Sequence, residues 1–200
     1  MKKIRSSLCH VISGAALALA ANVSLGGEVL FLNGGYAQMC SSAAKQVDHP
    51  EMMAITGSRL DVDPLKICTL AITEDANARH IVSGSYNNRG VIYFSRSNYA
   101  AAISDFQEAI RMQPDLGVVY VNLGYTYAAQ QRWAEAIAPL SRGIELGADD
   151  LPKAYYNRGI AYEETGRATE AYRDYLKASE LAPEWEAPRS ELTRFSVRRR

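Results

Sequence analysis

The chain has 200 residues, of which 48% are hydrophobic and 22% are charged, and its 22 basic side chains are balanced by 22 acidic ones. This length suits one ordinary domain with an additional segment. The balanced charge gives no electrostatic basis for binding nucleic acid or an anionic membrane surface.

The N-terminal stretch has the layout of a secretory signal. Basic residues within the first five positions precede an apolar run from residue 8 to about residue 21, and small residues follow. Two positions fit a small-x-small cleavage site, one after Ala37 and one after Ala20, and we favour the cut after Ala37. An uncleaved membrane anchor is the alternative, although polar residues such as Glu28 interrupt the apolar run. We expect residues 1–37 to direct export, with a periplasmic location.

Export would give the cysteines a structural meaning. Cys9 would leave with the signal, whereas Cys40 and Cys68 would remain as an even pair in an oxidising compartment. A disulfide between them would close a loop of roughly 29 residues and contribute about 3–4 kcal/mol by restricting the unfolded chain. Two buried free thiols are the alternative, and we favour the disulfide.

The segment 38–82 carries signals for short helices. One helix is expected around residues 41–47, where Pro50 follows its end. Asp63 and Pro64 mark a second start, with the aspartate as N-cap and the proline in the first turn. A further helix is expected to begin near Ala78 and to run into a regular pattern.

From about residue 83 onward, one sequence pattern occurs three times. The motif Tyr-x-Asn-x-Gly places Gly90, Gly124 and Gly159 at spacings of 34 and then 35 residues. A fixed period of this length is typical of stacked-repeat architectures, which usually form binding surfaces. Three units, each of two helices, are assigned to residues 83–116, 117–151 and 152–185. The C-terminal capping helix and its basic tail are assigned to residues 186–200.

These residues resemble the tetratricopeptide repeat family, whose unit is a helix-turn-helix of 34 residues. The match places a tyrosine, a glycine and a small residue at the family positions in each copy: Tyr86, Gly90 and Ala102; Tyr120, Gly124 and Ala136; Tyr155, Gly159 and Ala171. The resemblance implies an all-α fold, a three-repeat solenoid of antiparallel helix pairs with N-terminal extra helices and a C-terminal capping helix. The small residues would let paired helices approach closely while aromatic residues fill the space beside them.

In this family the first helices of the repeats line a concave groove that receives a partner peptide. The resemblance assigns the following residues of this chain to that groove: Asn87, Asn88, Val91, Phe94, Val121, Asn122, Tyr125, Lys153, Tyr156, Asn157 and Ile160. An amide has a donor and an acceptor, so Asn88, Asn122 and Asn157 can hold the main chain of an extended peptide. They can equally tie neighbouring helices together, and both interpretations stay open.

Some members of the family clamp a terminal carboxylate with lysine, asparagine and arginine at set groove positions. Asn122 and Lys153 match that clamp, whereas Asn87, Val91 and Asn157 stand where its other members would be. Two matches among five argue against this ligand. We expect instead a hydrophobic or mixed peptide segment.

The sequence gives little support to catalysis. His49 and His80 are solitary, and neither has a cysteine or carboxylate at metal-ligand spacing. No phosphate-binding loop or nucleophile elbow is present, so we expect no cofactor, metal or small-molecule substrate. The arginines at 198–200 are interpreted as a solvated tail, with contact to acidic lipids as the alternative.

The sequence thus predicts a non-catalytic protein–protein interaction adaptor in the bacterial cell envelope. One alternative is a structural module that associates with copies of itself. The other is a subunit of an envelope enzyme whose active part lies in residues 38–82.

Overall fold

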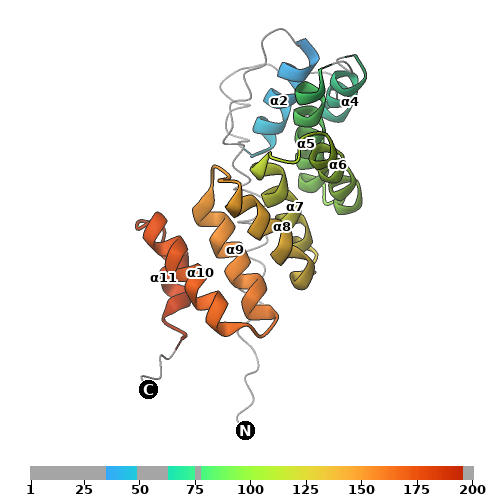
Figure 1. The fold of residues 1–200 in the computed structure, drawn as a ribbon. Helices are drawn as coiled ribbons and strands as arrows, with labels where there is room; N and C mark the ends of the chain where they lie inside the picture. The colour runs from blue at the N-terminus through green and yellow to red at the C-terminus, as the bar shows by residue number, and fades with distance from the viewer. Residues whose placement is uncertain (1–34, 49–62, 75–77, 196–200) are drawn as a thin grey trace.

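A computed structural model describes residues 35–48, 63–74 and 78–195, and these residues form α-helices joined by short turns (Figure 1). The expected all-α fold is confirmed, since this part of the chain contains no strand. In chain order the helices are α2 (Gly35–Asp48), α4 (Pro64–Glu74), α5 (Arg79–Ser95), α6 (Tyr99–Met112), α7 (Gly117–Ala129), α8 (Trp133–Glu145), α9 (Leu151–Glu164), α10 (Ala168–Leu181) and α11 (Glu186–Leu192).

The predicted signal lies mostly outside the described residues, as do His49 and the arginines at 198–200. Its last residues belong to α2, which begins at Gly35 and in which Ala37 is buried. A cut after Ala37 would therefore remove the start of this helix, and the cleavage site stays a prediction. None of the described helices is long and apolar enough to cross a membrane.

A disulfide joins α2 to α4 and confirms the predicted pairing of Cys40 with Cys68. Both cysteines are buried, and they lie in a small apolar cluster shared by α2, α4 and α5: Ala37, Ala43, Ala44, Ile67, Ala71, Ile81 and Ile92. Among the α2 side chains whose burial the structure describes, the buried ones beside Cys40 are all alanines. Because alanines bury little apolar area, the covalent bond is a main tie between α2 and the rest of the molecule.

Asp63 caps the N-terminus of α4, as the sequence predicted. Its Oδ1 accepts a hydrogen bond from the backbone N–H of Leu65 at 3.1 Å and another from Arg96 Nη2 at 2.8 Å. The hydrogen bond from Arg96 lowers the pKa of this carboxyl group. The same side chain thus ties the start of α4 to the end of α5.

In each repeat the first helix packs tightly against the second at the repeated glycine. A β-carbon built at the glycine would lie 2.6, 2.5 or 2.8 Å from the large side chain opposite, in the pairs Gly90 with Phe106, Gly124 with Leu140 and Gly159 with Tyr175. These separations are shorter than van der Waals contact, so the backbone approach depends on glycine. The predicted packing role of the glycines is confirmed.

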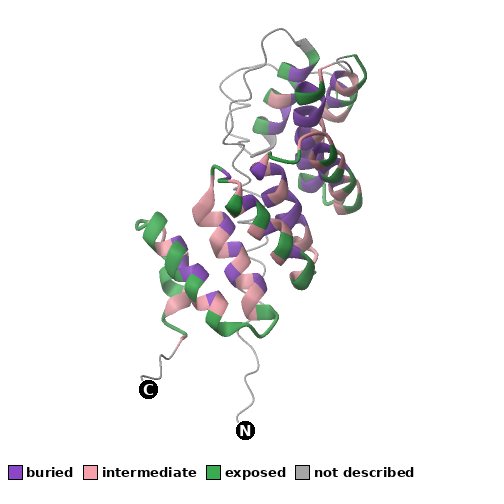
Figure 2. Cartoon of the chain, viewed as in Figure 1, coloured by how far each residue is buried: buried purple, intermediate pink, exposed green. Residues whose placement is uncertain are grey.

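The stack encloses α5 and α7 most completely. Both helices carry buried residues around most of their circumference (Figure 2), because neighbouring helices cover them on several sides. At the C-terminal end, Trp185 packs on the ring of Tyr156 with 4.8 Å between centroids. Arg194, just after α11, donates to Glu163 of α9 at 2.8 Å. The last helix therefore closes the stack, as predicted.

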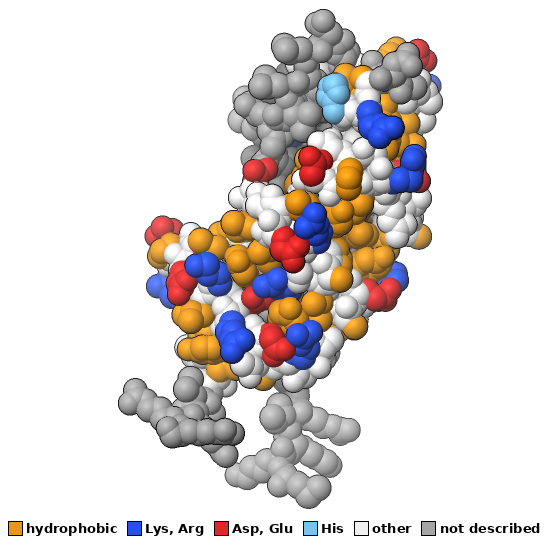
Figure 3. Space-filling model, in the orientation of Figure 1, with side chains coloured by type: hydrophobic (Ala, Val, Ile, Leu, Met, Phe, Trp, Pro, Cys, Tyr) orange, Lys and Arg blue, Asp and Glu red, His pale blue; other side chains and the backbone are white. Residues whose placement is uncertain are grey.

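Charged side chains of both signs are interspersed on the surface, and hydrophobic side chains gather over the middle of the molecule, where α7 and α8 lie (Figure 3). Several of the charges are paired along their own helix, three residues apart: Arg111 with Glu108, Arg132 with Glu135, Arg142 with Glu145, Arg167 with Glu170 and Lys177 with Glu180. Such pairs leave little unbalanced field on the outer faces of the repeats.

Candidate functional site

Most of the residues that the sequence assigned to a groove are buried. Eight of the eleven belong to the interior: Asn87, Asn88, Val91, Phe94, Val121, Asn122, Tyr125 and Asn157. The other three, Lys153, Tyr156 and Ile160, are half-buried. These positions serve largely to pack the first helices against their neighbours, and their contact with a partner stays a prediction.

The repeated asparagines have three different environments. The Asn122 side-chain nitrogen donates to Oδ1 of Asn87 at 2.9 Å, which joins α7 to α5. The Asn157 side-chain nitrogen donates to the backbone carbonyl of Lys153 at 2.8 Å, within α9. The Asn88 side chain, 6% exposed, makes no hydrogen bond with any described residue. Asn122 thus ties two helices together, whereas Asn88 ties no helix to another within the part of the chain that the structure describes.

Two tyrosines of the predicted groove are packed against other side chains, Tyr125 fully buried and Tyr156 half-buried. The Tyr125 hydroxyl is buried without a hydrogen-bond partner in the part of the chain that the structure describes, and burial raises its pKa far above the ordinary range. Tyr156 lies between Trp185 and Tyr175, and burial raises its pKa to about 12. The Tyr125 ring therefore forms no open wall for a ligand.

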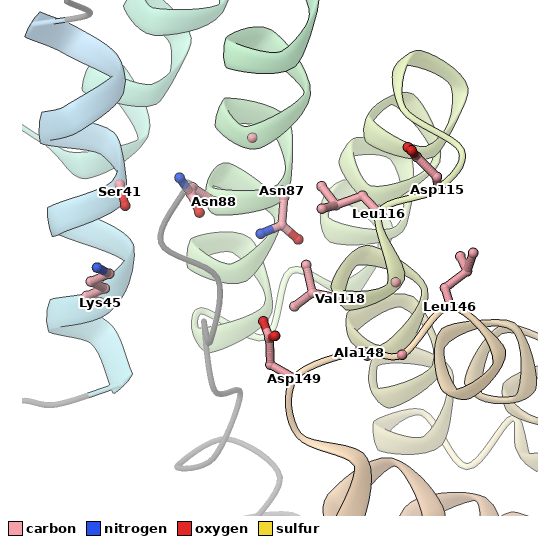
Figure 4. A pocket seen from close by; sticks show the side chains of 13 residues that line it. Ser41, Lys45, Asn87, Asn88, Asp115, Leu116, Val118, Leu146, Ala148 and Asp149 are labelled. Carbon is pink, nitrogen blue, oxygen red and sulfur yellow. The ribbon is translucent and has the colours of Figure 1, made fainter. Parts of the chain in front are cut away.

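An accessible pocket of about 230 Å³ opens between α2, α5 and α7 (Figure 4). Its side walls include Ser41 and Lys45 of α2, Asn87 and Asn88 of α5, and Val118 of α7. The turns before α7 and before α9 complete it with Asp115 and Asp149. In Figure 4, Asn88 is directed toward α2, while Asn87 and Asp149 converge on the space beside Val118.

The charges at this pocket differ from those on the outer faces of the repeats. Lys45, Asp115 and Asp149 are exposed, and none of them forms an ion pair with a residue that the structure describes. Lys45 stands on the α2 wall, opposite the turn that carries Asp149. The pocket therefore presents charges of both signs that have no ion-pair partner among the described residues, and beside them the Asn88 amide.

Sequence reasoning found Asn87 and Asn88 but missed the other walls. Ser41 and Lys45 precede the repeats, so no repeat position could assign them to a groove. The cysteine pair indicated that α2 lies near α4, but not that α2 faces α5. A signal was available for Asp149, because it belongs to the turn that holds the extra residue of the middle repeat.

Metal-dependent chemistry finds no ready site in the described ranges. They contain no group of three or more histidine, cysteine, aspartate or glutamate side chains that could hold a metal ion. His80 is exposed near the start of α5. The pocket's side chains can donate and accept hydrogen bonds and can pair with charge, which suits binding.

Comparison with protein families assigns the helix pairs. Residues 84–116 and residues 152–185 each match a model of the tetratricopeptide repeat. These segments are tetratricopeptide repeats. Between them, α7 and α8 form a helix pair of the same kind.

Curated relatives share only a portion of their length with this chain. Protein unc-45 homolog B of Xenopus laevis is 31% identical over 94 residues, which is 46% of this chain and 10% of that protein. Serine/threonine-protein phosphatase 5 of Homo sapiens is 29% identical over 91 residues, which is 46% of this chain and 18% of that protein. The chain thus spans about a tenth to a fifth of the length of these relatives.

Solved structures share the fold. The first repeat domain of Spaghetti (RPAP3), bound to the HSP90 peptide SRMEEVD, has a TM-score of 0.53 at 25% identity and covers 56% of this chain and 88% of its own. A double mutant of MamA RS-1 has a TM-score of 0.61 at 18% identity, with coverage of 80% and 82%. TTC0263 of Thermus thermophilus has a TM-score of 0.52 at 17% identity, with coverage of 93% and 91%.

The two residues that match a carboxylate clamp are both engaged within this repeat protein. Lys153 forms an ion pair with Asp150 at 2.7 Å, and Asn122 donates to Asn87. A terminal carboxylate would have to displace these contacts. The geometry therefore agrees with the sequence argument against that ligand class.

Proposed function

We propose that this protein is a non-catalytic adaptor that binds a peptide or protein segment in the pocket between α2, α5 and α7. Tetratricopeptide repeats are typically interaction modules, and the RPAP3 domain of the same fold is described as bound to a peptide. The pocket offers hydrogen-bonding groups and apolar surface together, which is the usual makeup of a recognition site.

The observation that carries this proposal is the side chain of Asn88. It is buried, it lines the pocket, and its amide makes no hydrogen bond with any described residue. Because this amide faces the pocket, its nitrogen and its oxygen can hydrogen-bond to a ligand there. The main chain of an extended segment would supply both a carbonyl and an N–H to this amide.

We further propose that the adaptor works in the bacterial cell envelope. Two features support export: the signal-like N-terminal stretch, and the bridge between Cys40 and Cys68. Disulfides persist in oxidising compartments and are rare in the reducing cytosol of ordinary bacteria. An accessible-thiol assay on cells and on their periplasmic extract would locate the protein and its redox state together.

Photocrosslinking tests the binding proposal. A photoreactive residue replacing Val118, which is half-buried and lines the pocket, should capture a partner that mass spectrometry can identify. Gln107 is exposed on α6 and does not line the pocket, so the same substitution there is the matched control. Equal capture from both positions, or none from either, would contradict binding in the pocket. Capture of a second copy of this chain would establish the self-associating alternative instead.

A further inference from the structure

We propose that the pocket between α2, α5 and α7 selects a segment carrying a basic side chain, and that the Asp149 carboxylate receives this cation. The inference rests on the proposed function and adds the chemistry of the partner. Its basis is the set of charged side chains around Asn88 that have no ion-pair partner in the described part of the chain.

Asn87 and Asn88 provide the contact with the peptide backbone, which does not depend on the sequence of the bound segment. Asn88 has no hydrogen-bond partner among the described residues, and it points toward α2 across the pocket. Asn87 has its Oδ1 occupied by Asn122, which leaves its side-chain nitrogen directed at the same space. Together these amides can hold one stretch of peptide backbone between α2 and α7.

Asp149 provides the contact that depends on charge. Its carboxylate turns toward the space beside Asn87 and Val118, and it has no ion-pair partner in the described part of the chain. The apolar Val118 side chain suits the methylene stem of a lysine or arginine whose charged end reaches the carboxylate. Asp115 adds a second negative charge from the turn before α7.

Lys45 limits how much positive charge the segment can carry. It stands on the α2 wall, away from Asp149, and is itself unpaired with any described residue. A second cation placed near α2 would be repelled, whereas an acidic or neutral residue would be accepted there. The pocket thus fits a single basic residue near α7 better than a uniformly basic segment.

The segment proposed for this pocket differs in charge from the peptide in the RPAP3 complex. The sequence SRMEEVD carries three acidic side chains and one basic side chain. In the present chain the pocket contains more carboxylates than ammonium groups, and Lys153 is paired with Asp150. This protein and the RPAP3 domain, which share a fold, would then bind segments of opposite charge.

Peptide libraries test the inference on the full chain with its disulfide intact. The probes are six-residue peptides with blocked ends, in which one position is fixed as lysine, arginine, leucine, glutamate or aspartate and the others are randomised. Binding to the immobilised protein is measured as enrichment by mass spectrometry. We expect lysine and arginine to be enriched about fivefold over leucine, and glutamate to be depleted. Raising the salt concentration should reduce the difference.

Variants of the pocket assign the preference to its residues. Asp149→Asn should abolish the enrichment of basic peptides, and Asp149→Lys should reverse it toward glutamate. Glu145→Gln is the matched control, since it removes one negative charge four residues earlier without touching the pocket. Asn88→Ala should weaken all peptides alike, and a thermal unfolding curve would show that the variant is folded.

The outcomes separate this inference from the proposed function. If no peptide of any charge is enriched, both the pocket's peptide binding and its charge preference are wrong. If peptides bind without preferring a basic residue, or if the preference survives Asp149→Asn, the charge inference is overturned while binding stands.

Discussion

Arg158 of α9 donates two hydrogen bonds to Asp174 of α10, from Nε to Oδ2 at 2.7 Å and from Nη2 to Oδ1 at 2.8 Å. Arg89 and Asp105 form the same bidentate pair between α5 and α6, with the same two distances. Paired N–H groups of a guanidinium match the two oxygens of a carboxylate, which fixes direction as well as distance. In the first and the third repeat, the same kind of ion pair therefore joins the first helix to the second.

Each of these arginines also reaches the helix that precedes its repeat. Arg158 Nη1 donates to the Ser141 hydroxyl of α8, and Arg89 Nη1 donates to the Thr69 hydroxyl of α4, both at 3.0 Å. The contact of α4 with α5 is therefore equivalent to the contact of α8 with α9. The disulfide-linked N-terminal helices thus continue the stack beyond the sequence repeats.

The middle repeat lacks this pair. One period separates Arg89 from Leu123 and Asp105 from Pro139, so both charges are replaced together. Leu123 and Pro139 instead line an open hollow of about 510 Å³, with Tyr120 and Tyr127 beside them. Replacing one partner alone would leave a buried charge unpaired, which is far more costly than replacing both.

Removing one charge of the pair in the third repeat should therefore lower the free energy of unfolding more than removing both charges. In Asp174→Ala the Arg158 side chain, 16% exposed, loses its carboxylate, and we expect the free energy of unfolding to fall by about 3 kcal/mol. The double variant Arg158→Leu with Asp174→Ala, which imitates the middle repeat, should lose less. Urea unfolding measures both, and a larger loss in the double variant would contradict the argument.

The turn inside each repeat needs a left-handed residue. Ser97, Gln131 and Gly166 occupy the same repeat position with φ of 58°, 58° and 78°, and only the third is the residue that favours this conformation. Gln131→Gly should raise the free energy of unfolding by about 1 kcal/mol, because a side chain is strained at positive φ. Gln130, with φ of −90°, provides the control: Gln130→Gly should give no gain. Differential scanning calorimetry of the two variants would decide.

Reducing the disulfide should loosen the N-terminal end selectively. The bonded residues are separated by 28 positions in the sequence, and a loop of that size is worth about 3–4 kcal/mol to the folded state. Since α2 is held largely by alanines and this bond, its amide hydrogens should exchange much faster after reduction, while those of α9 and α10 should change little. Hydrogen exchange with mass spectrometry tests this, with the Cys40→Ser and Cys68→Ser double variant as a check. Unchanged protection in α2 would show that noncovalent packing suffices.

Tyr156 should contribute to unfolding at high pH. Its pKa is raised from 10.0 to about 12, first by burial and then by the charge of Glu191. A raised pKa means that folding favours the protonated form. This contribution is fully present below pH 10 and is lost as the pH rises through about 12. Tyr156→Phe should move the alkaline unfolding transition, followed by circular dichroism, to higher pH.

Much of the fold was predictable from the sequence because it depends on local rules. The period of 34 and 35 residues, the repeated glycines, the aspartate cap of α4 and the cysteine pair each indicate a structure through spacing or residue type. The close contact of Gly124 with Leu140 shows why such a pattern is informative. Only certain residues fit positions where two backbones touch, so those positions leave a mark in the sequence.

The candidate site was less predictable, because it depends on which surfaces meet. The repeat pattern could place Asn88 and Asn122 at one equivalent position, but it could not distinguish the amide that bonds to Asn87 from the one that opens into a pocket. That difference arises because α2 stands beside α5 and supplies Ser41 and Lys45, while the turn before α9 supplies Asp149. The spacing of residues along the chain is enough to predict that this protein stacks helix pairs. Tertiary packing decided which of its equivalent residues are buried as ties and which are left with unused hydrogen-bonding atoms, since neighbours distant in the chain determine burial.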